Sequence, residues 1–211
     1  MMMGGGRGGS YPKKVLLLGG TRFIGLYLAR QLIAEGHDVT LLTRGNKPID
    51  TMIPDDEEEP QVYARFRDRI KHIRADRTDA AGLKAALAHT NFDVLYDING
   101  REALDAEMIL DAMPYLRRYI FCSSAGVYKK SEEMPHFETD EGDPKSRHKG
   151  KLDTEEFLRK KGVAWTSVRP VYIYGPLNYN PVNGRGGRER EREREGWMRP
   201  LMVDMDRRRN E

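Results

Sequence analysis

Residues 14–36 read KVLLLGGTRFIGLYLARQLIAEG, and this stretch determines the fold that we expect. The apolar run Val15–Leu18 predicts a strand buried on both faces. The apolar residues after the glycines recur at helical spacing, and Gly36 is a typical helix C-cap. Glycines between a strand and a helix permit a tight turn and a close approach of backbone N–H groups to a pyrophosphate. The stretch therefore predicts a nucleotide-binding strand–loop–helix unit.

The rest of the chain repeats the alternation of strands and helices. Short apolar or β-branched runs follow at 39–42, 72–73, 94–96, 119–121 and 164–168. Helical patterns cover 22–35, 61–68, 78–89, 101–113 and 151–161. This order predicts an α/β fold with a Rossmann-like, doubly wound parallel sheet in the order 3-2-1-4-5-6. The acidic run Asp55–Glu59 is expected to form a solvated surface turn.

The composition fits one folded domain with polar ends. Of the 211 residues, 38% are hydrophobic and 33% are charged, so the chain is more polar than an average domain, which is roughly 45–50% apolar. We expect a flexible glycine-rich N-terminus at 1–12, an NAD(P)-binding domain at 13–182 and a disordered low-complexity tail at 183–211. The tail contains GGREREREREG, which has no apolar face to bury.

Composition also excludes several classes of protein. No apolar run is long enough to cross a membrane, and the single Cys122 cannot form an internal disulfide. Residues 1–10 lack the apolar region of a secretory signal and are not a clear transit peptide. The net charge is +3, but Gly184–Glu211 holds nine Arg and seven acidic residues, which leaves +1 for the remainder. Only a local basic patch could therefore bind a polyanion.

The glycine loop and the ends of the next two strands supply the expected cofactor site. Arg44 ends the second strand, where an acidic residue would bind the ribose of NAD, and its guanidinium suits a 2′-phosphate. This favours NADP over NAD, although an exposed Arg without a ligand is the alternative. Asp76 is placed to accept from an adenine amino group. Arg22 stands where a middle glycine is usual. The predicted cofactor-binding residues are Gly19, Gly20, Thr21, Arg22, Phe23, Ile24, Gly25, Arg44 and Asp76.

The segment Cys122–Tyr128 follows the fifth strand, where short-chain dehydrogenases/reductases place a Ser that assists a Tyr-x-x-x-Lys pair. That Tyr exchanges a proton with a carbonyl or alcohol. None of the ten Tyr residues here has Lys four positions later. Lys151 can stand for the Lys, but Arg147 then occupies the Tyr position, and an Arg cannot serve as the acid or base. Redox or epimerase chemistry of this kind is therefore in doubt.

Basic residues gather at the start of the last predicted helix, at Lys145, Arg147, His148, Lys149 and Lys151. Phosphate oxygens are natural partners for this cluster, and Tyr128, Tyr172 and Tyr174 could stack on bases. The alternative is a solvated helix start, partly offset by Glu155 and Glu156. A second basic stretch, 65–74, fits a solvated face better.

Six segments carry a family resemblance: GGTRFIG (19–25), VTLLTRG (39–45), FDVLYDINGRE (92–102), CSSAGVY (122–128), DPKSRHKGKL (143–152) and RPVYIYGPLNYNPV (169–182). Together they resemble the b-type chloroplast stem-loop binding proteins, atypical members of the short-chain dehydrogenase/reductase superfamily. The resemblance covers about 13–182 and implies a missing C-terminal lobe. It also implies plastid localisation, binding of structured RNA, a metal-dependent endoribonuclease activity with a metal such as Mg²⁺, association with ribosomes and transcription complexes, and homo-oligomers.

The leading hypothesis from the sequence is a plastid RNA-binding protein on an NAD(P)-binding scaffold, acting in rRNA or mRNA stability or processing. Its candidate catalytic residues are Ser124, Tyr128, His148 and Lys151. Asp97 and Asp140 are weaker metal candidates, because neither has clear ligand spacing, and no metal site is predicted. An NAD(P)-dependent nucleotide-sugar epimerase or dehydratase and a non-catalytic fragment are the alternatives.

Overall fold

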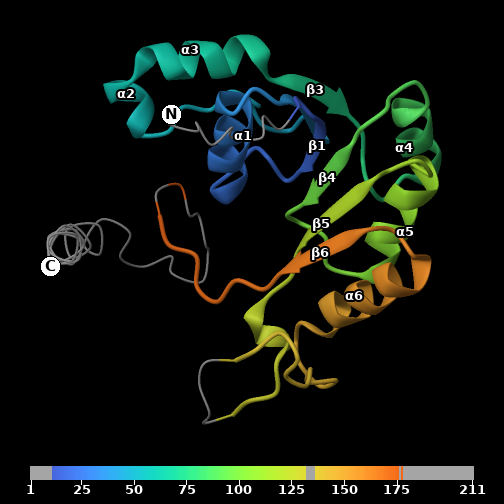
Figure 1. Cartoon of the computed structure of the whole chain (residues 1–211). Helices are drawn as coiled ribbons and strands as arrows, with labels where there is room; N and C mark the ends of the chain where they lie inside the picture. The colour runs from blue at the N-terminus through green and yellow to red at the C-terminus, as the bar shows by residue number, and fades with distance from the viewer. Residues whose placement is uncertain (1–10, 132–135, 176, 178–211) are drawn as a thin grey trace, which may run out of the picture. The chain divides into compact units, whose positions relative to one another are not determined.

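A computed structural model describes residues 11–131, 136–175 and 177. Most of the predicted glycine-rich N-terminus and the whole predicted tail lie outside the described residues. The described chain forms a six-stranded parallel sheet in the order β3-β2-β1-β4-β5-β6, which confirms the predicted topology (Figure 1). The strands are β1 (Lys14–Leu18), β2 (Asp38–Thr43), β3 (Lys71–Arg74), β4 (Val94–Asp97), β5 (Arg118–Cys122) and β6 (Trp165–Val168).

Helices connect successive strands. They are α1 (Ile24–Ala34), α2 (Asp55–Glu58), α3 (Pro60–Arg69), α4 (Ala80–Leu87), α5 (Ala103–Ala112) and α6 (Lys149–Lys161), with a short 3₁₀ turn at Ala125–Val127. No helix in the described part of the chain is long and apolar enough to span a bilayer. The ends of helices shift slightly from the predicted bounds. For example, α4 is capped by Asp79, which accepts from Gly82 N at 3.0 Å, and not by Thr78.

The core consists of two apolar layers, one on each face of the sheet. Leu16 and Leu18 of β1 pack with the residues of α4 and α5, whereas Val15 and Leu17 pack with α1 and α3. Alternate side chains of a strand point to opposite faces, so a continuously apolar strand serves both layers. Because β1 pairs in parallel with β2 and with β4, its C-terminal end and the glycine loop after it lie where these two strands also end.

The acidic run was expected to form a solvated surface turn, and this prediction is wrong in part: Asp55 and Glu57–Glu59 are exposed, but the run forms a short helix and Asp56 is buried. Residues Asp55–Glu58 form α2, and Asp56 is only 2% exposed. Its carboxylate accepts from the buried Arg30 of α1, at 3.1 Å from Nε and 2.5 Å from Nη2. The Arg30 guanidinium lies over the ring of Phe66 in α3. A buried guanidinium needs a charged partner, and this requirement brings Asp56 into the interior.

Candidate functional site

The glycine loop places the start of α1 against the end of β1. Gly19 adopts a φ of 95°, and a methyl group at Gly25 would overlap the carbonyl of Gly19, so α1 can approach the loop this closely only with glycine there. Phe23 has a φ of 43° and makes no side-chain cap on α1. No side chain caps the first turn, and the N–H groups of Gly25 and Leu26 donate to the backbone carbonyls of Arg22 and Phe23, both at 3.0 Å. The positive end of the α1 dipole, beside the glycine loop, favours an anion at this place.

A cavity of about 610 Å³ opens beside this loop. This volume lies within the range of small-molecule and cofactor sites, roughly 300–1,000 Å³. Five of the predicted cofactor residues line it, namely Gly19, Thr21, Arg22, Arg44 and Asp76. Gly20 and Gly25 are buried. Phe23 and Ile24 instead border a second hollow of about 430 Å³, together with Tyr27, Asp55, Tyr174 and Gly175.

The cavity wall is rich in positive charge. Within the described residues, the exposed side chains of Arg22, Arg44, Lys47 and Arg101 line the cavity and form no ion pair. Asp76 is the acidic residue nearest to Arg44 in this wall. Its carboxylate accepts from the Thr78 backbone N–H at 2.9 Å, and this bond, more than the charge of Arg44, lowers the pKa of Asp76. Guanidinium groups without an ion pair in the described chain, beside a close-packed glycine loop, suit the phosphates of a dinucleotide.

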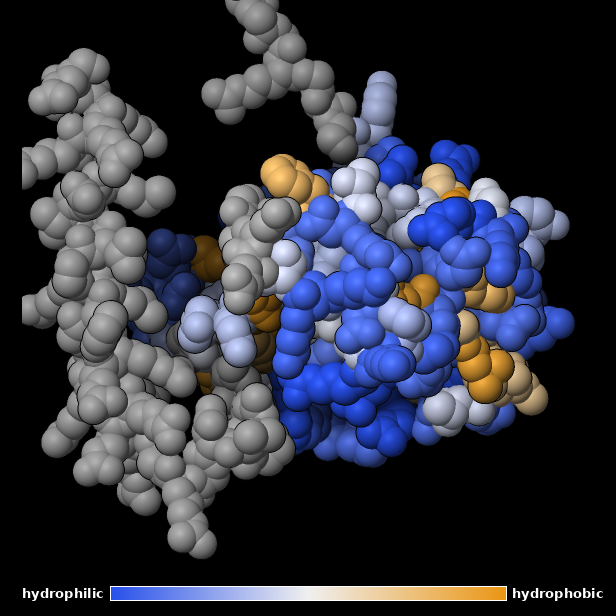
Figure 2. Space-filling view, turned by 90° about the horizontal axis from the view of Figure 1, so that it is seen from below, coloured by the Kyte–Doolittle hydropathy of each residue, from blue (hydrophilic) through white to orange (hydrophobic). Residues whose placement is uncertain are grey.

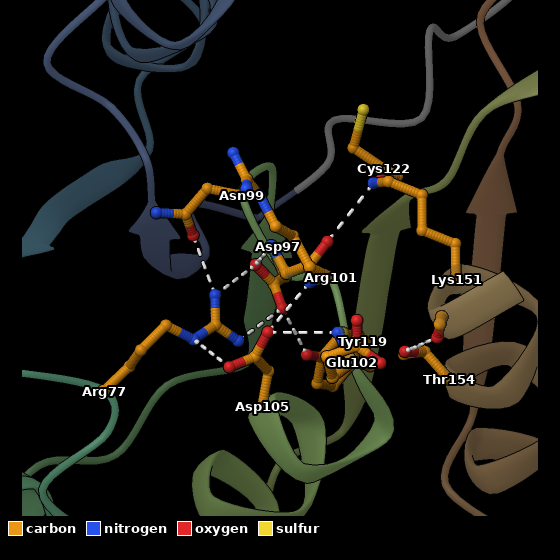
Figure 3. A network of polar contacts seen from close by, with 12 residues as sticks. Arg77, Asp97, Asn99, Arg101, Glu102, Asp105, Tyr119, Cys122, Lys151 and Thr154 are labelled. Atoms are coloured by element: carbon orange, nitrogen blue, oxygen red, sulfur yellow. Dashed lines mark hydrogen bonds and ion pairs between the residues drawn. The ribbon is translucent and has the colours of Figure 1, made fainter. Parts of the chain in front are cut away.

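A buried network lies behind the cavity wall, to which it contributes Arg77 and Asn99, and the sequence did not predict it (Figure 3). Arg77 donates to both carboxylate oxygens of Asp97, at 2.9 and 2.8 Å, and Tyr119 donates to the same carboxylate at 2.7 Å. Burial raises the pKa of Asp97, but the hydrogen bonds and charge of Arg77 outweigh it and the pKa is lowered. The only sequence signal for this network is a pair of opposite charges after β3 and at the end of β4.

Neither weak metal candidate is placed to bind a metal. Both carboxylate oxygens of Asp97 are taken by Arg77, and Asp140 pairs with His136 at 3.0 Å. The described residues contain no group of three or more His, Cys, Asp or Glu side chains that could hold a metal ion. Within the part of the chain that the structure describes, neither carboxylate belongs to a set of ligands that fits a divalent metal.

Lys151 reaches the same network from the other side (Figure 3). Its ammonium donates to the carbonyl of Cys122 at 2.5 Å and to the carbonyl of Gly100 at 3.2 Å. Burial is the main reason why the pKa of Lys151 is lowered. The alternative interpretation of the basic cluster, a solvated helix start, is therefore wrong for Lys151, which is half-buried. The helix begins at Lys149 and turns Lys151 toward the ends of β4 and β5.

Ser124 and Tyr128 flank the 3₁₀ turn after β5. The Ser124 hydroxyl caps this turn by accepting from Gly126 N at 3.1 Å. The ring of Tyr128 stacks on His136 with centroids 4.8 Å apart, and Arg169 lies over the same ring. Tyr128 is therefore engaged within the protein. Tyr172 and Tyr174, in contrast, are 79% and 75% exposed, with their rings 6.3 Å apart.

The remaining basic residues of the cluster lie at the start of α6. Lys145, Arg147 and Lys149 are exposed, and Lys149 pairs with Asp153 at 2.5 Å. Arg147 Nε donates to His148 Nε2 at 3.1 Å. Burial, followed by the charges of Arg147 and Lys151, lowers the pKa of His148. Among the described residues, Lys145 and Arg147 form no ion pair.

The acidic residues that were expected to offset this cluster have other partners. Glu155 is buried and binds Arg169 at 2.5 Å and Ser167 at 2.7 Å. Glu156 pairs with Arg159 and Lys160, farther along α6. Among the described residues, Lys149 is thus the one member of the Lys145, Arg147 and Lys149 set that has an ion pair. The segment between β5 and α6 lies at the bottom of Figure 1, and the face seen from below in Figure 2 is mostly hydrophilic.

Comparison of the sequence with known proteins also indicates a site for a nicotinamide dinucleotide. Residues 19–194 match the model of a family described as NAD(P)H-binding. The chain is 60% identical over 173 residues to the chloroplast stem-loop binding protein of 41 kDa b from Arabidopsis thaliana, covering 82% of this chain and 45% of that protein. This relative confirms the resemblance seen in the sequence, and it is a chloroplast protein, in agreement with the predicted plastid localisation.

Solved structures share the fold. The UDP-glucose 4-epimerase of Bifidobacterium longum, in complex with NAD⁺ and UDP, has a TM-score of 0.60 at 22% identity, over 74% of this chain and 52% of that one. The enzyme from Thermotoga maritima, with UDP-glucose, has a TM-score of 0.61 at 18% identity, over 78% and 57%. The chain thus spans about half the length of the proteins that it matches. By its sequence match and its Rossmann-like sheet, the chain belongs to the NAD(P)H-binding family.

Proposed function

We propose that the domain binds an NADP-type dinucleotide in the cavity beside the glycine loop. The observation that carries this proposal is the position of Arg44, whose exposed side chain lines the same cavity as Gly19 and Thr21 and has no ion pair among the described residues. A 2′-phosphate is the group that distinguishes NADP from NAD, and a guanidinium binds it with two charge-assisted hydrogen bonds.

Each part of the dinucleotide has a counterpart in the wall of the cavity. Gly19, Thr21 and the start of α1 would hold the pyrophosphate, with Arg22 adding positive charge. Arg44 would hold the 2′-phosphate, and Asp76 would accept from the adenine amino group. When bound, the nicotinamide supplies a hydride donor or acceptor. Because Arg147 stands in the Tyr position and stays protonated, we propose binding rather than dehydrogenase or epimerase catalysis.

A titration with NADPH and with NADH, followed by nicotinamide fluorescence, tests this function. We expect saturable binding of NADPH and weaker binding of NADH. An unchanged fluorescence of both cofactors up to millimolar protein would refute the proposed function.

A second function, binding of structured RNA in the plastid, is favoured by the start of α6. Lys145 and Arg147 are exposed and without an ion pair in the described chain, and Tyr172 and Tyr174 expose their rings. Basic side chains bind the phosphate backbone, and exposed rings stack on unpaired bases. The name of the Arabidopsis relative describes stem-loop binding. Filter binding with a stem-loop RNA tests this function, and the absence of retention at low salt would refute it.

A further inference from the structure

Arg101 occupies the loop that connects β4 to α5, on the rim of the cavity. Its backbone is held firmly, because Arg101 N and Glu102 N both donate to Asp105, at 2.8 and 3.1 Å, and Gly100 N donates to Asp97 at 2.8 Å. The guanidinium itself is exposed and forms no ion pair with any described residue. A fixed backbone thus presents an uncompensated positive charge.

The same loop packs against the start of α6 (Figure 3). A methyl group at Gly150 would overlap both the carbonyl of Arg101 and the carboxylate of Glu102, so the helix and the loop are in direct contact. Lys151 Nζ, one residue farther on, donates to the carbonyl of Gly100 at 3.2 Å. The dinucleotide cavity and the basic cluster are therefore separated by a single loop.

Positive charges continue across this loop. Burial lowers the pKa of Lys151, and the nearby charge of Arg101 lowers it further. The pKa of His148 is lowered by burial, then by Arg147 and by Lys151. Three cations, Arg101, Lys151 and Arg147, thus follow one another from the cavity rim to the exposed start of α6, with His148, whose Nε2 accepts from Arg147, between the last two. Like charges gathered in this way attract a polyanion strongly.

We propose that Arg101 belongs to both binding surfaces, so that a bound NADP-type dinucleotide and a bound RNA compete for it. This inference rests on the two proposed functions. One guanidinium cannot pair fully with a dinucleotide phosphate and an RNA phosphate at once. A dinucleotide in the cavity also brings negative charge beside Arg101, which reduces the positive potential that Arg101 and its neighbour Lys151 present to a second polyanion. Each ligand therefore lowers the affinity for the other.

The test measures binding of a fluorescent stem-loop RNA to the full chain, with and without saturating NADPH. Coupling between two sites is commonly 5- to 150-fold, so we expect NADPH to raise the Kd for RNA by at least about fivefold. Because binding linkage is reciprocal, saturating RNA should raise the Kd for NADPH by the same factor. Arg101→Gln should bring this factor close to one, and Arg101→Lys should retain most of it.

Arg65→Gln is the matched control, because it removes one exposed positive charge from α3 and should leave the coupling unchanged. If both ligands bind separately but the Kd for RNA does not respond to NADPH, the competition is refuted and the proposed functions stand. If NADPH alone does not bind, the proposed dinucleotide site fails, and the competition fails with it. Coupling that persists in Arg101→Gln would refute the role of Arg101. A cooperative thermal unfolding transition, followed by intrinsic fluorescence, shows that each variant is folded.

Discussion

Arg77 lines the cavity and holds both oxygens of the Asp97 carboxylate, which lies behind it. Arg77 also donates to the side chain of Asn99 at 2.7 Å, so one guanidinium connects the buried end of β4 to the cavity surface. The side chain of Asp97 is fully buried and that of Arg77 is 12% exposed. A charge pair of this kind is costly to break from one side, because the remaining charge stays buried.

Asp97→Asn should therefore destabilise the domain strongly. Removing one partner of a buried ion pair costs about 3–5 kcal/mol, since Arg77 would lose its counter-charge. Urea denaturation followed by circular dichroism measures the loss. Lys71→Ala breaks the exposed pair of Lys71 with Asp38 and is the control, with an expected cost below about 1 kcal/mol. An equal cost for the two variants would contradict the structural importance of the buried pair.

The lowered pKa of Asp97 should make the free energy of unfolding depend on pH. The pKa of Asp97 is lowered in the folded state, relative to about 3.9 in an unfolded chain. Its contribution is therefore complete above about pH 4 and is lost as the pH falls through the lower folded-state pKa. We expect the difference in unfolding free energy between the wild type and Asp97→Asn to shrink below pH 4. A constant difference from pH 6 to pH 2.5 would show that Asp97 is not the group responsible.

Gly25→Ala should damage both the fold and the cavity. The added methyl group would meet the backbone of Gly19 and Gly20, which cannot move aside as a flexible side chain would. Overpacking of this kind costs about 1–3 kcal/mol, and the displaced glycine loop should lose most of its affinity for NADPH. Gly36→Ala is the control, because it meets no atom within 4 Å and carries only the strain of a positive φ. It should leave NADPH binding intact.

The start of α6 predicts the salt dependence of RNA binding. A variant combining Lys145→Ala, Arg147→Ala and Lys149→Ala removes three exposed charges and leaves the half-buried Lys151 in place. Each lost phosphate contact should reduce the log–log salt slope by about 0.7, so the triple variant should lose about two units. Lys149 already pairs with Asp153, so we expect it to contribute least of the three to the salt slope.

The control for this slope lies on α3. A variant combining Arg65→Ala, Arg67→Ala and Arg69→Ala removes the same formal charge from a helix away from the cavity. Filter binding at several salt concentrations compares the two variants. If the α3 variant flattens the slope as much as the α6 variant, binding follows total charge and the basic cluster has no special role.

Local patterns predicted the fold well. The apolar run Val15–Leu18 and the glycines after it are a short-range signal, and burial on both faces of the sheet follows from them directly. The sequence also predicted that Arg44 and the glycine loop lie at one site. They follow neighbouring parallel strands, and the C-terminal ends of such strands lie at the same side of the sheet.

Long-range pairing could not be predicted in this way. Asp56 looks solvated in an acidic run, and only the buried Arg30, 26 positions earlier, explains its burial. The pairing of Arg77 with Asp97 and the inward turn of Lys151 depend on which strand ends become neighbours. Glu155 was expected to offset the basic cluster, but the helix turns it toward Arg169 instead. Ion-pair partners that lie far apart in the sequence are brought together by tertiary packing, and the sequence carries no periodic pattern that would reveal them.

The proposed NADP site stands or falls with the preference for NADPH and with its dependence on Arg44. Isothermal titration of the wild type and of Arg44→Asp with NADPH and with NADH gives the four dissociation constants needed. A charge-assisted contact to the 2′-phosphate is worth about 1.5–3 kcal/mol, so the wild type should bind NADPH about 10- to 100-fold more tightly than NADH. Arg44→Asp should abolish that preference and leave the Kd for NADH nearly unchanged. Equal affinity of the wild type for the two cofactors, or an equal loss of both in Arg44→Asp, would contradict the account.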